Sequence, residues 1–315
     1  MFVELAPLAA PAEHVAVEAA RPPVARRALR ALPPFLYLAP GLGCLVVWTY
    51  RPLVEAVQLS FYRWNLLPTR PKVPVGLDNY QQVFQLPELR HSLWLTVATI
   101  VCLLPFSVVL PTIISLLTRR VRGRVGVVYR ALVFAPVLVP PLASAAMWVW
   151  LLDPEHGLVN RMLGQSINWL HERGPAQLAI IGITGWHLLG FAVLVVTAGL
   201  ANINDEYSAA AQLDGATRRQ ITRWITLPLL SPTLVLLTLM TVLLSGQLTF
   251  PLIDALTQGG PDDATTNAYY LLWEYCFKSF NAGLASAAGL TFFLGFGLVA
   301  LFLVWLFEKL SFHDN

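Results

Sequence analysis

The sequence predicts an all-α membrane protein with six transmembrane helices, and three observations indicate this class. Of the 315 residues, 56% are hydrophobic and only 12% are charged, about half the charged fraction of a soluble domain. Four runs lack Asp, Glu, Lys and Arg, and each exceeds the ~20 residues that a spanning helix needs. They are residues 92–117, 131–152, 227–253 and 284–307. The runs are continuous and do not alternate, which argues against a transmembrane β-barrel.

Two further runs complete the count of six. Residues 178–200 are interrupted only by His187, and a run over about residues 35–62 contains Arg51, which we expect to reach the outer interface. Prolines inside three runs predict bends, either as ordinary kinks or as features that shape a transport pathway. They are Pro40 in the first run, Pro105 and Pro111 in the second, and Pro136, Pro140 and Pro141 in the third.

Basic residues are distributed unevenly between alternate loops. Thirteen lie before Phe35, in the loop after residue 117, in segment 202–228 and at the C-terminus, whereas seven lie in the other loops. Because cytoplasmic loops carry the excess of Lys and Arg, both termini and segment 202–228 are predicted to be cytoplasmic. Residues 1–34 lack the basic start and compact apolar core of a signal peptide, so we expect a flexible cytoplasmic arm before a membrane domain of residues 35–315.

Several kinds of chemistry are excluded by the residues present. The chain has no GxxxxGK[ST] motif, so we expect no ATP hydrolysis by a P-loop of its own. The motifs HExxH and GxSxG are missing as well, and Cys44, Cys102 and Cys276 are not spaced as metal ligands or as a disulfide framework. His187 is the one residue inside the runs that we expect to titrate. The sequence therefore predicts no catalytic residues and no metal site.

Segment 202–228, with the sequence NINDEYSAAAQLDGATRRQITRWITLP, is a polar interruption between two apolar runs. Asn204 or Asp205 can cap a short helix that ends at Leu213. The pair Asp214-Gly215 then breaks this helix with a residue suited to positive φ. The residues from Ser208 to Ala211 are small, which predicts either a close docking surface or an ordinary solvated loop.

The second half of this segment predicts another short helix. Thr217 can cap it, and Ile221 and Ile225 share one face at i, i+4 spacing. Pro228 is suited to the first turn of the next apolar run. We expect two short helices at an angle, with the Ile221 and Ile225 face available for docking.

The stretch AAAQLDGATRRQITRWITLP resembles the cytoplasmic signature loop of bacterial ABC-importer permeases, in which EAA is followed by two residues, DGA and a later ITLP-type ending. The elements LDGA and ITLP match in type and spacing, whereas Ala209 stands at the position of the family's Glu. Three other stretches also resemble this family: VGLDNYQQVF (75–84), FAPVLVPPLASAAMWVWLLDPEHGLVN (134–160) and LTQGGPDDATTNAYYLLWEYCFKSFNAGLASA (256–287). Together they are similar to the carbohydrate-type permeases, a branch that includes maltose and glycerol-3-phosphate permease subunits.

This resemblance implies a type I ABC importer permease fold in the bacterial cytoplasmic membrane, surrounded by lipid. The implied partners are a second homologous permease subunit in a heterodimer, a dimer of ABC ATPase subunits and an extracytoplasmic solute-binding protein, with no nucleic acid. ATP and Mg would bind the ATPase, so no cofactor is expected on this chain. The resemblance assigns ATPase coupling to Ala209, Ala210, Leu213, Asp214, Gly215, Ala216, Ile221, Ile225 and Pro228.

The resemblance also implies a sugar or a glycerol-3-phosphate-type compound as the solute, without separating the two. A polyhydroxylated solute needs hydrogen-bonding groups and flat apolar faces at membrane depth. The candidates for its pathway are Trp148, Trp186, His187, Ser245, Gln247 and Thr249. Intrahelical bonds, an interfacial aromatic belt or a bond between helices are the structural alternatives. A self-contained channel or secondary transporter is the alternative function, and it would need charged relay residues that the runs lack.

Overall fold

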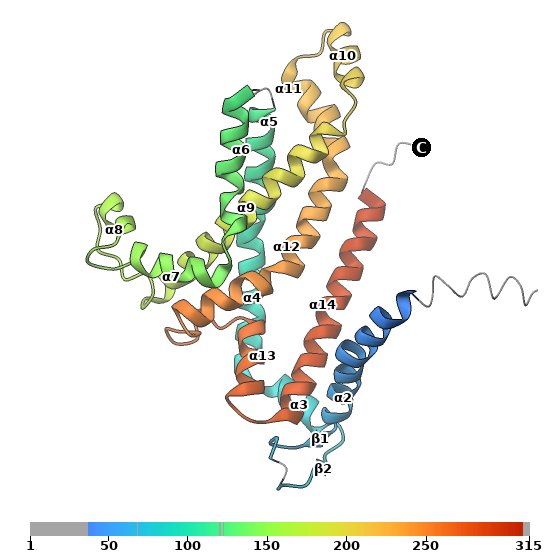
Figure 1. The fold of residues 1–315 in the computed structure, drawn as a ribbon, viewed down its shortest axis with the longest axis vertical. Coiled ribbons are helices and arrows are strands. Elements are labelled where there is room, and N and C mark those ends of the chain that lie inside the picture. Colours follow the sequence, from blue (N-terminus) through green and yellow to red (C-terminus); the bar gives the residue numbers. More distant parts are fainter. Residues whose placement is uncertain (1–36, 68, 120, 122, 311–315) are drawn as a thin grey trace, which may run out of the picture. The chain divides into compact units, whose positions relative to one another are not determined.

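The computed structural model describes residues 37–67, 69–119, 121 and 123–310, and most of the described chain is helical (Figure 1). The predicted arm, residues 1–34, lies outside the described residues. The chain divides into two compact units, residues up to Glu55 and residues from Ala56 onward. In the first unit, residues 37–45 are helical and lead into a π-helical segment, η1 (Val46–Tyr50), and the start of α2 (Arg51–Leu59).

Four helices in the described residues are long and apolar enough to cross a membrane. The first combines α4 (Pro87–Leu104), η2 (Pro105–Val109) and α5 (Leu110–Thr118). The others are α9 (Arg173–Ala201), the helix Arg218–Leu256, and α14 (Ala282–Leu310), whose spanning part is Ala282–Leu306. They coincide with the predicted runs 92–117, 178–200, 227–253 and 284–307, which confirms those four.

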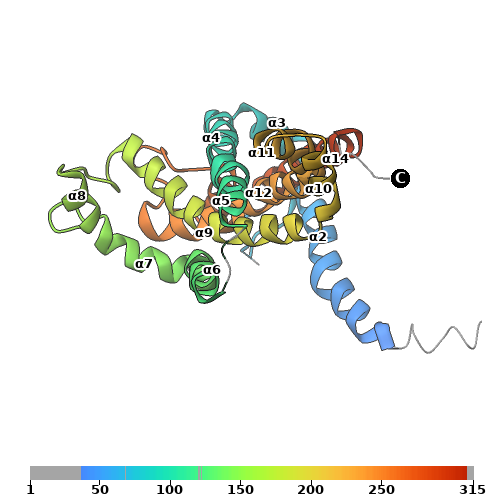
Figure 2. The same ribbon diagram turned by 90° about the horizontal axis from the view of Figure 1, so that it is seen from above.

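The predicted run 131–152 is not one continuous helix. It is divided between α6 (Gly123–Leu138) and α7 (Pro141–Leu151), whose axes meet at 100°. Figure 2 shows α6 end-on while α7 runs across the view. Pro140 and Pro141 cause the break, because proline lacks the N–H of a helical hydrogen bond and its ring collides with the preceding turn. The described residues thus hold four spans, or five if this pair counts as one, and the count of six stays a prediction.

Prolines also explain the three π-helical segments. η1, η2 and η3 (Thr222–Thr226) each end two residues before a proline, namely Pro52, Pro111 and Pro228. A proline ring would collide with the carbonyl four residues earlier in a regular α-helix, and the wider π turn removes that carbonyl from its path. The helix therefore continues through each proline instead of ending there.

Helix α9 is the central packing element of the second unit. It contacts α4, α5, α6 and α12 (Leu227–Leu256), and glycines bring its backbone close to two of them. A Cβ on Gly190 would lie 2.5 Å from the Val133 carbonyl oxygen of α6, and one on Gly199 would lie 2.6 Å from Thr233 Oγ1 of α12. Small residues at helix crossings are typical of membrane bundles, where van der Waals packing drives association.

Loops that are predicted to share a side of the membrane do lie together. At one end is a short hairpin of β1 (Tyr62–Arg63) and β2 (Val73–Pro74), with α3 (Asp78–Gln85), α8 (Leu158–Leu163) and α13 (Ala268–Phe277) in the same set of loops. The Ala282 N–H donates to the Trp64 carbonyl, and Arg173 bonds the Asp262 carbonyl, which joins three separate loops. The Tyr275 hydroxyl donates to Glu88 at 3.0 Å, and partial burial together with this bond raises the pKa of Tyr275 above its usual range.

Candidate functional site

The first half of segment 202–228 folds as its residues predict. Helix α10 (Asp205–Leu213) begins after Asn204, whose Oδ1 accepts from the Glu206 N–H at 3.0 Å. Asn204 and not Asp205 is therefore the cap, so the Asp205 carboxylate is available for another partner. Gly215 adopts φ +81°, a conformation that side chains disfavour, and it turns the chain sharply after α10.

The second half differs from the predicted short helix. Thr217 caps α11 (Arg218–Ile221) in a reciprocal capping box with Gln220, which confirms the predicted start. However, α11 continues through η3 into α12, so that Arg218–Leu256 forms one helix of 39 residues. The expectation of a second, separate short helix is wrong, because the π turn accommodates Pro228 without ending the helix. Any displacement at α11 would therefore be carried directly into a membrane-spanning helix.

The predicted coupling residues fall into exposed and buried groups. Ala209, Ala210, Leu213, Asp214 and Gly215 are exposed, and the Leu213 residue is 90% exposed although it is apolar. Ala216, Ile225 and Pro228 are half-buried.

Ile221 is only 6% exposed and packs inside the chain, so the expected Ile221 and Ile225 docking face is wrong for Ile221. Sequence reasoning missed Trp224, which is 70% exposed and has the Arg223 guanidinium over its ring at 5.3 Å. Its signal was an aromatic residue in a polar segment. The exposed apolar surface of this region is thus formed chiefly by Leu213 and Trp224.

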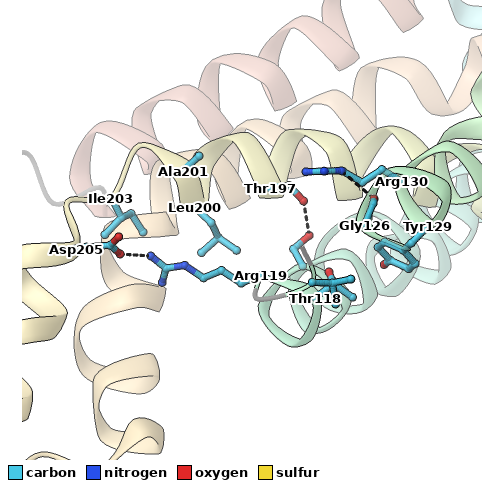
Figure 3. A pocket seen from close by; sticks show the side chains of 12 residues that line it. Thr118, Arg119, Gly126, Tyr129, Arg130, Thr197, Leu200, Ala201, Ile203 and Asp205 are labelled. Atoms are coloured by element: carbon cyan, nitrogen blue, oxygen red, sulfur yellow. Dashed lines mark hydrogen bonds and ion pairs between the residues drawn. The ribbon is translucent and has the colours of Figure 1, made fainter. Parts of the chain in front are cut away.

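An ion pair connects α10 to the end of α5. Arg119 Nη2 lies 2.7 Å from Asp205 Oδ1 (Figure 3), which also confirms that the two basic loops lie at the same end. Beside it a groove of about 830 Å³ separates α10 from α5 and α11, lined in part by Leu117, Gln212 and Arg218. Sequence reasoning counted Arg119 only as a charge, because its partner lies 86 residues away.

Three of the predicted pathway residues lie together between α7 and α9. Trp148 of α7 and Trp186 of α9 pack edge to face with ring centroids 5.9 Å apart, and the His187 ring lies 5.1 Å from that of Trp186. Trp148 Nε1 is buried and has no hydrogen-bond partner among the described residues. It is an unused donor beside an aromatic face, a combination that suits the ring and hydroxyl groups of a sugar.

His187 holds the broken span in place. Its Nδ1 lies 2.9 Å from the Pro136 carbonyl oxygen, and its Nε2 lies 2.9 Å from Ser144 Oγ. Pro140 cannot supply the helical N–H that Pro136 would otherwise receive, so the imidazole takes its place. The alternative of a bond between helices is therefore observed for His187.

The candidates on α12 have hydrogen-bond partners other than this cluster, or are exposed. Ser245 and Thr249 are buried, and their hydroxyls donate to the carbonyls of Val242 and Ser245, as the structural alternative predicted. Thr249 Oγ1 also accepts from Asn267 Nδ2 at 3.0 Å. Gln247 is exposed on the outside of this unit, where it could face a partner. Among the described residues, no group of three His, Cys, Asp or Glu side chains could hold a metal ion.

The long apolar helices, the broken span and the exposed loop at one end define a polytopic membrane permease. Residues 112–311 match the family described as binding-protein-dependent transport system inner membrane component, and the chain belongs to this family. It is therefore the permease component of a binding-protein-dependent ABC importer, a transport subunit and not an enzyme.

Two curated relatives match most of the chain. The trehalose/maltose transport system permease protein of Thermococcus litoralis is 33% identical over 280 residues, which are 85% of this chain and 92% of that protein. The sn-glycerol-3-phosphate transport system permease protein of Shigella flexneri is 29% identical over 278 residues, 86% of this chain and 92% of that protein. The resemblance identified from the signature loop is thereby confirmed.

Two solved structures are similar in fold. One is a bacterial ABC transporter involved in the import of the acidic polysaccharide alginate, with a TM-score of 0.79 and 22% identity over 91% of this chain and 99% of that chain. The other is the bacterial alginate transporter in complex with an alginate pentasaccharide-bound periplasmic protein, with a TM-score of 0.76 and 23% identity over 91% and 96%. The fold is that of type I ABC importer permeases.

Proposed function

We propose that this permease imports a sugar or oligosaccharide, driven by ATP hydrolysis on a partner subunit that docks on α10. The observation that carries the proposal is the exposed helix α10, with Leu213 beside the Gly215 turn, followed by one helix from Arg218 to Leu256. A partner that binds α10 and moves it can also displace the helix Arg218–Leu256. Only the short turn at Gly215 lies between the two, and the helix after it is continuous.

The proposed assembly contains a second, related permease subunit, two ABC ATPase subunits that bind ATP and Mg, and an extracytoplasmic solute-binding protein. The alginate transporter complex with its periplasmic protein supports the last of these partners. We place the assembly in the bacterial cytoplasmic membrane with α10 on the cytoplasmic side, on the strength of the excess of basic residues in that set of loops.

The solute class is inferred from the interior and the relatives. Trp148, Trp186 and His187 form a packed aromatic cluster at the broken span, and aromatic faces suit sugar rings. The two curated relatives transport trehalose/maltose and glycerol-3-phosphate, as their names state. A neutral sugar is favoured over a phosphate ester because the runs that hold these three side chains, residues 131–152 and 178–200, contain no Arg or Lys.

The test uses the chain reconstituted with the ATPase, second permease and binding protein of the same organism. Gly215→Pro is incompatible with φ +81°, whereas Gly215→Asn tolerates it. We expect the proline variant to lose ATP-dependent uptake of maltose or trehalose and the asparagine variant to retain it. Unchanged uptake by the proline variant, or uptake without ATP and the ATPase, would instead indicate a self-contained channel or secondary transporter.

A further inference from the structure

A hollow lies between the end of α5, the start of α6 and the end of α9. It has a volume of about 290 Å³ and is lined by the ends of α5 and α9, the start of α6 and Asp205 of α10 (Figure 3). Two guanidinium groups belong to it, Arg119 from α5 and Arg130 from α6. Among the described residues that line it, these two guanidinium groups and the Asp205 carboxylate leave one positive charge in excess.

The donors of this hollow are only partly used within the described residues. Arg119 is paired with Asp205, whereas Arg130 uses Nε to donate to the Gly126 carbonyl at 3.0 Å and has no acidic partner there. The Tyr129 hydroxyl is buried and has no hydrogen-bond partner. A buried hydroxyl without a partner is unfavourable, so a bound acceptor would stabilise it. The remaining donors of Arg130 and the Tyr129 hydroxyl are of the kind that binds an anion.

A phosphate group matches these donors best. The planar fork of a guanidinium bonds two oxygens of a phosphate at once, and a phenol supplies a further donor. We propose that the hollow lined by Arg119, Tyr129 and Arg130 binds the phosphate of an anionic phospholipid headgroup.

The surroundings favour a lipid over free phosphate as the source. The site lies where an apolar span ends and a turn with several arginines begins, which is the level of the membrane surface. Next to it on α6, Val125, Val128 and Leu132 are exposed at 71%, 57% and 70%. Their spacing of i, i+3 and i+7 forms one apolar stripe, along which acyl chains can lie. Tyr129 and Arg130 belong to α6 and not to α10, so substitutions at these two residues test the site without changing the proposed coupling helix.

The test measures lipid retention by native mass spectrometry on the purified full-length chain. Dioleoyl phosphatidylglycerol, dioleoyl phosphatidylcholine or inorganic phosphate is added in separate arms. We expect phosphatidylglycerol to be retained in preference to phosphatidylcholine, with a loss of about ten-fold or more in Arg130→Gln. Tyr129→Phe, which keeps the ring and its packing, should lose a few-fold. Arg124→Gln is the matched control, because Arg124 is an exposed arginine at the start of α6 that is not among the residues lining the hollow.

Three results would overturn the proposal. The first is equal retention of phosphatidylglycerol by Arg130→Gln and Arg124→Gln. The second is equal retention of both lipids by the unmodified chain. The third is thermal stabilisation by millimolar inorganic phosphate that depends on Arg130, without any preference for phosphatidylglycerol, which would assign the site to free phosphate. Arg130→Lys keeps the charge and loses the fork, so an intermediate retention by this variant would support the phosphate geometry.

Discussion

The His187 imidazole lies 2.9 Å from the Pro136 carbonyl oxygen, 51 residues earlier in the chain. A carbonyl can only accept, so Nδ1 carries the proton, and Nε2 of the neutral ring then accepts from Ser144. One side chain of α9 thus bonds both sides of the 100° break between α6 and α7. We therefore expect the break between α6 and α7 to be rigid, because His187 of α9 holds both of its sides.

Replacing His187 should therefore loosen the broken span. We expect His187→Leu to lower the free energy of unfolding by about 1–3 kcal/mol, because two buried hydrogen bonds are lost. Thermal unfolding of the purified chain in detergent measures this change. Ser144→Ala is the control: it removes the Nε2 partner and the local bond of Ser144 to the Pro141 carbonyl, but it keeps the bond of Nδ1 to Pro136 and should cost less. An unchanged melting temperature in His187→Leu would contradict the structural role.

The ion pair between Arg119 and Asp205 should matter for transport more than for stability. Exposed pairs contribute about 0–1 kcal/mol, so Asp205→Asn should leave the melting temperature nearly unchanged. Since this pair connects α10 to α5, we expect a several-fold decrease in ATP-dependent uptake by the reconstituted importer. Glu206→Gln is the matched control: it changes the neighbouring carboxylate, which bonds only the side chain of Asn204 in the described contacts. Equal uptake by both variants would show that the pair does not transmit motion.

Leu213 is predicted to be an anchor for the ATPase subunit. Leu213→Asp places a charge at a position that is 90% exposed, so folding should be unaffected. If this side chain is buried on docking, association with the ATPase should weaken by ten-fold or more, because burial of a leucine stabilises by about 1.5–3 kcal/mol. Co-purification of the tagged permease with the ATPase measures this. Leu213→Met keeps an apolar side chain of similar size and should retain association; a Leu213→Asp variant that also retains it would argue against docking at α10.

Substitution of Gly246 and of Gly182 by alanine should have opposite effects on stability. An added Cβ at Gly246 would collide with the ring of Tyr269, whereas one at Gly182 has no atom within 4 Å. Gly246→Ala should therefore destabilise the chain by about 1–3 kcal/mol through overpacking. Gly182→Ala should be neutral or stabilise by up to about 1 kcal/mol, because alanine is the better helix former. Thermal unfolding of both variants gives the comparison, and a stable Gly246→Ala variant would mean that Tyr269 can move aside.

Four spanning helices, the Thr217 cap, a first cap at Asn204 or Asp205 and the Gly215 turn could all be predicted, because each depends on neighbours in the sequence. The effects of Pro140 and Pro228 on their helices could not be predicted. Both remove a backbone N–H, yet one ends a helix and the other is accommodated by a π turn. The choice depends on what packs around the freed carbonyl, and that environment comes from other helices.

The sequence by itself determined the class of protein, the family and the loop that we propose for coupling, since apolar run length, charge distribution and a local motif are one-dimensional signals. Tertiary structure alone decided that Ile221 is buried, that Arg119 pairs with Asp205, that His187 bridges the break, and that Tyr129 and Arg130 share a hollow. Each of these depends on which helices cross and at what depth. Close packing between segments distant in the chain settles such contacts, and no single segment encodes them.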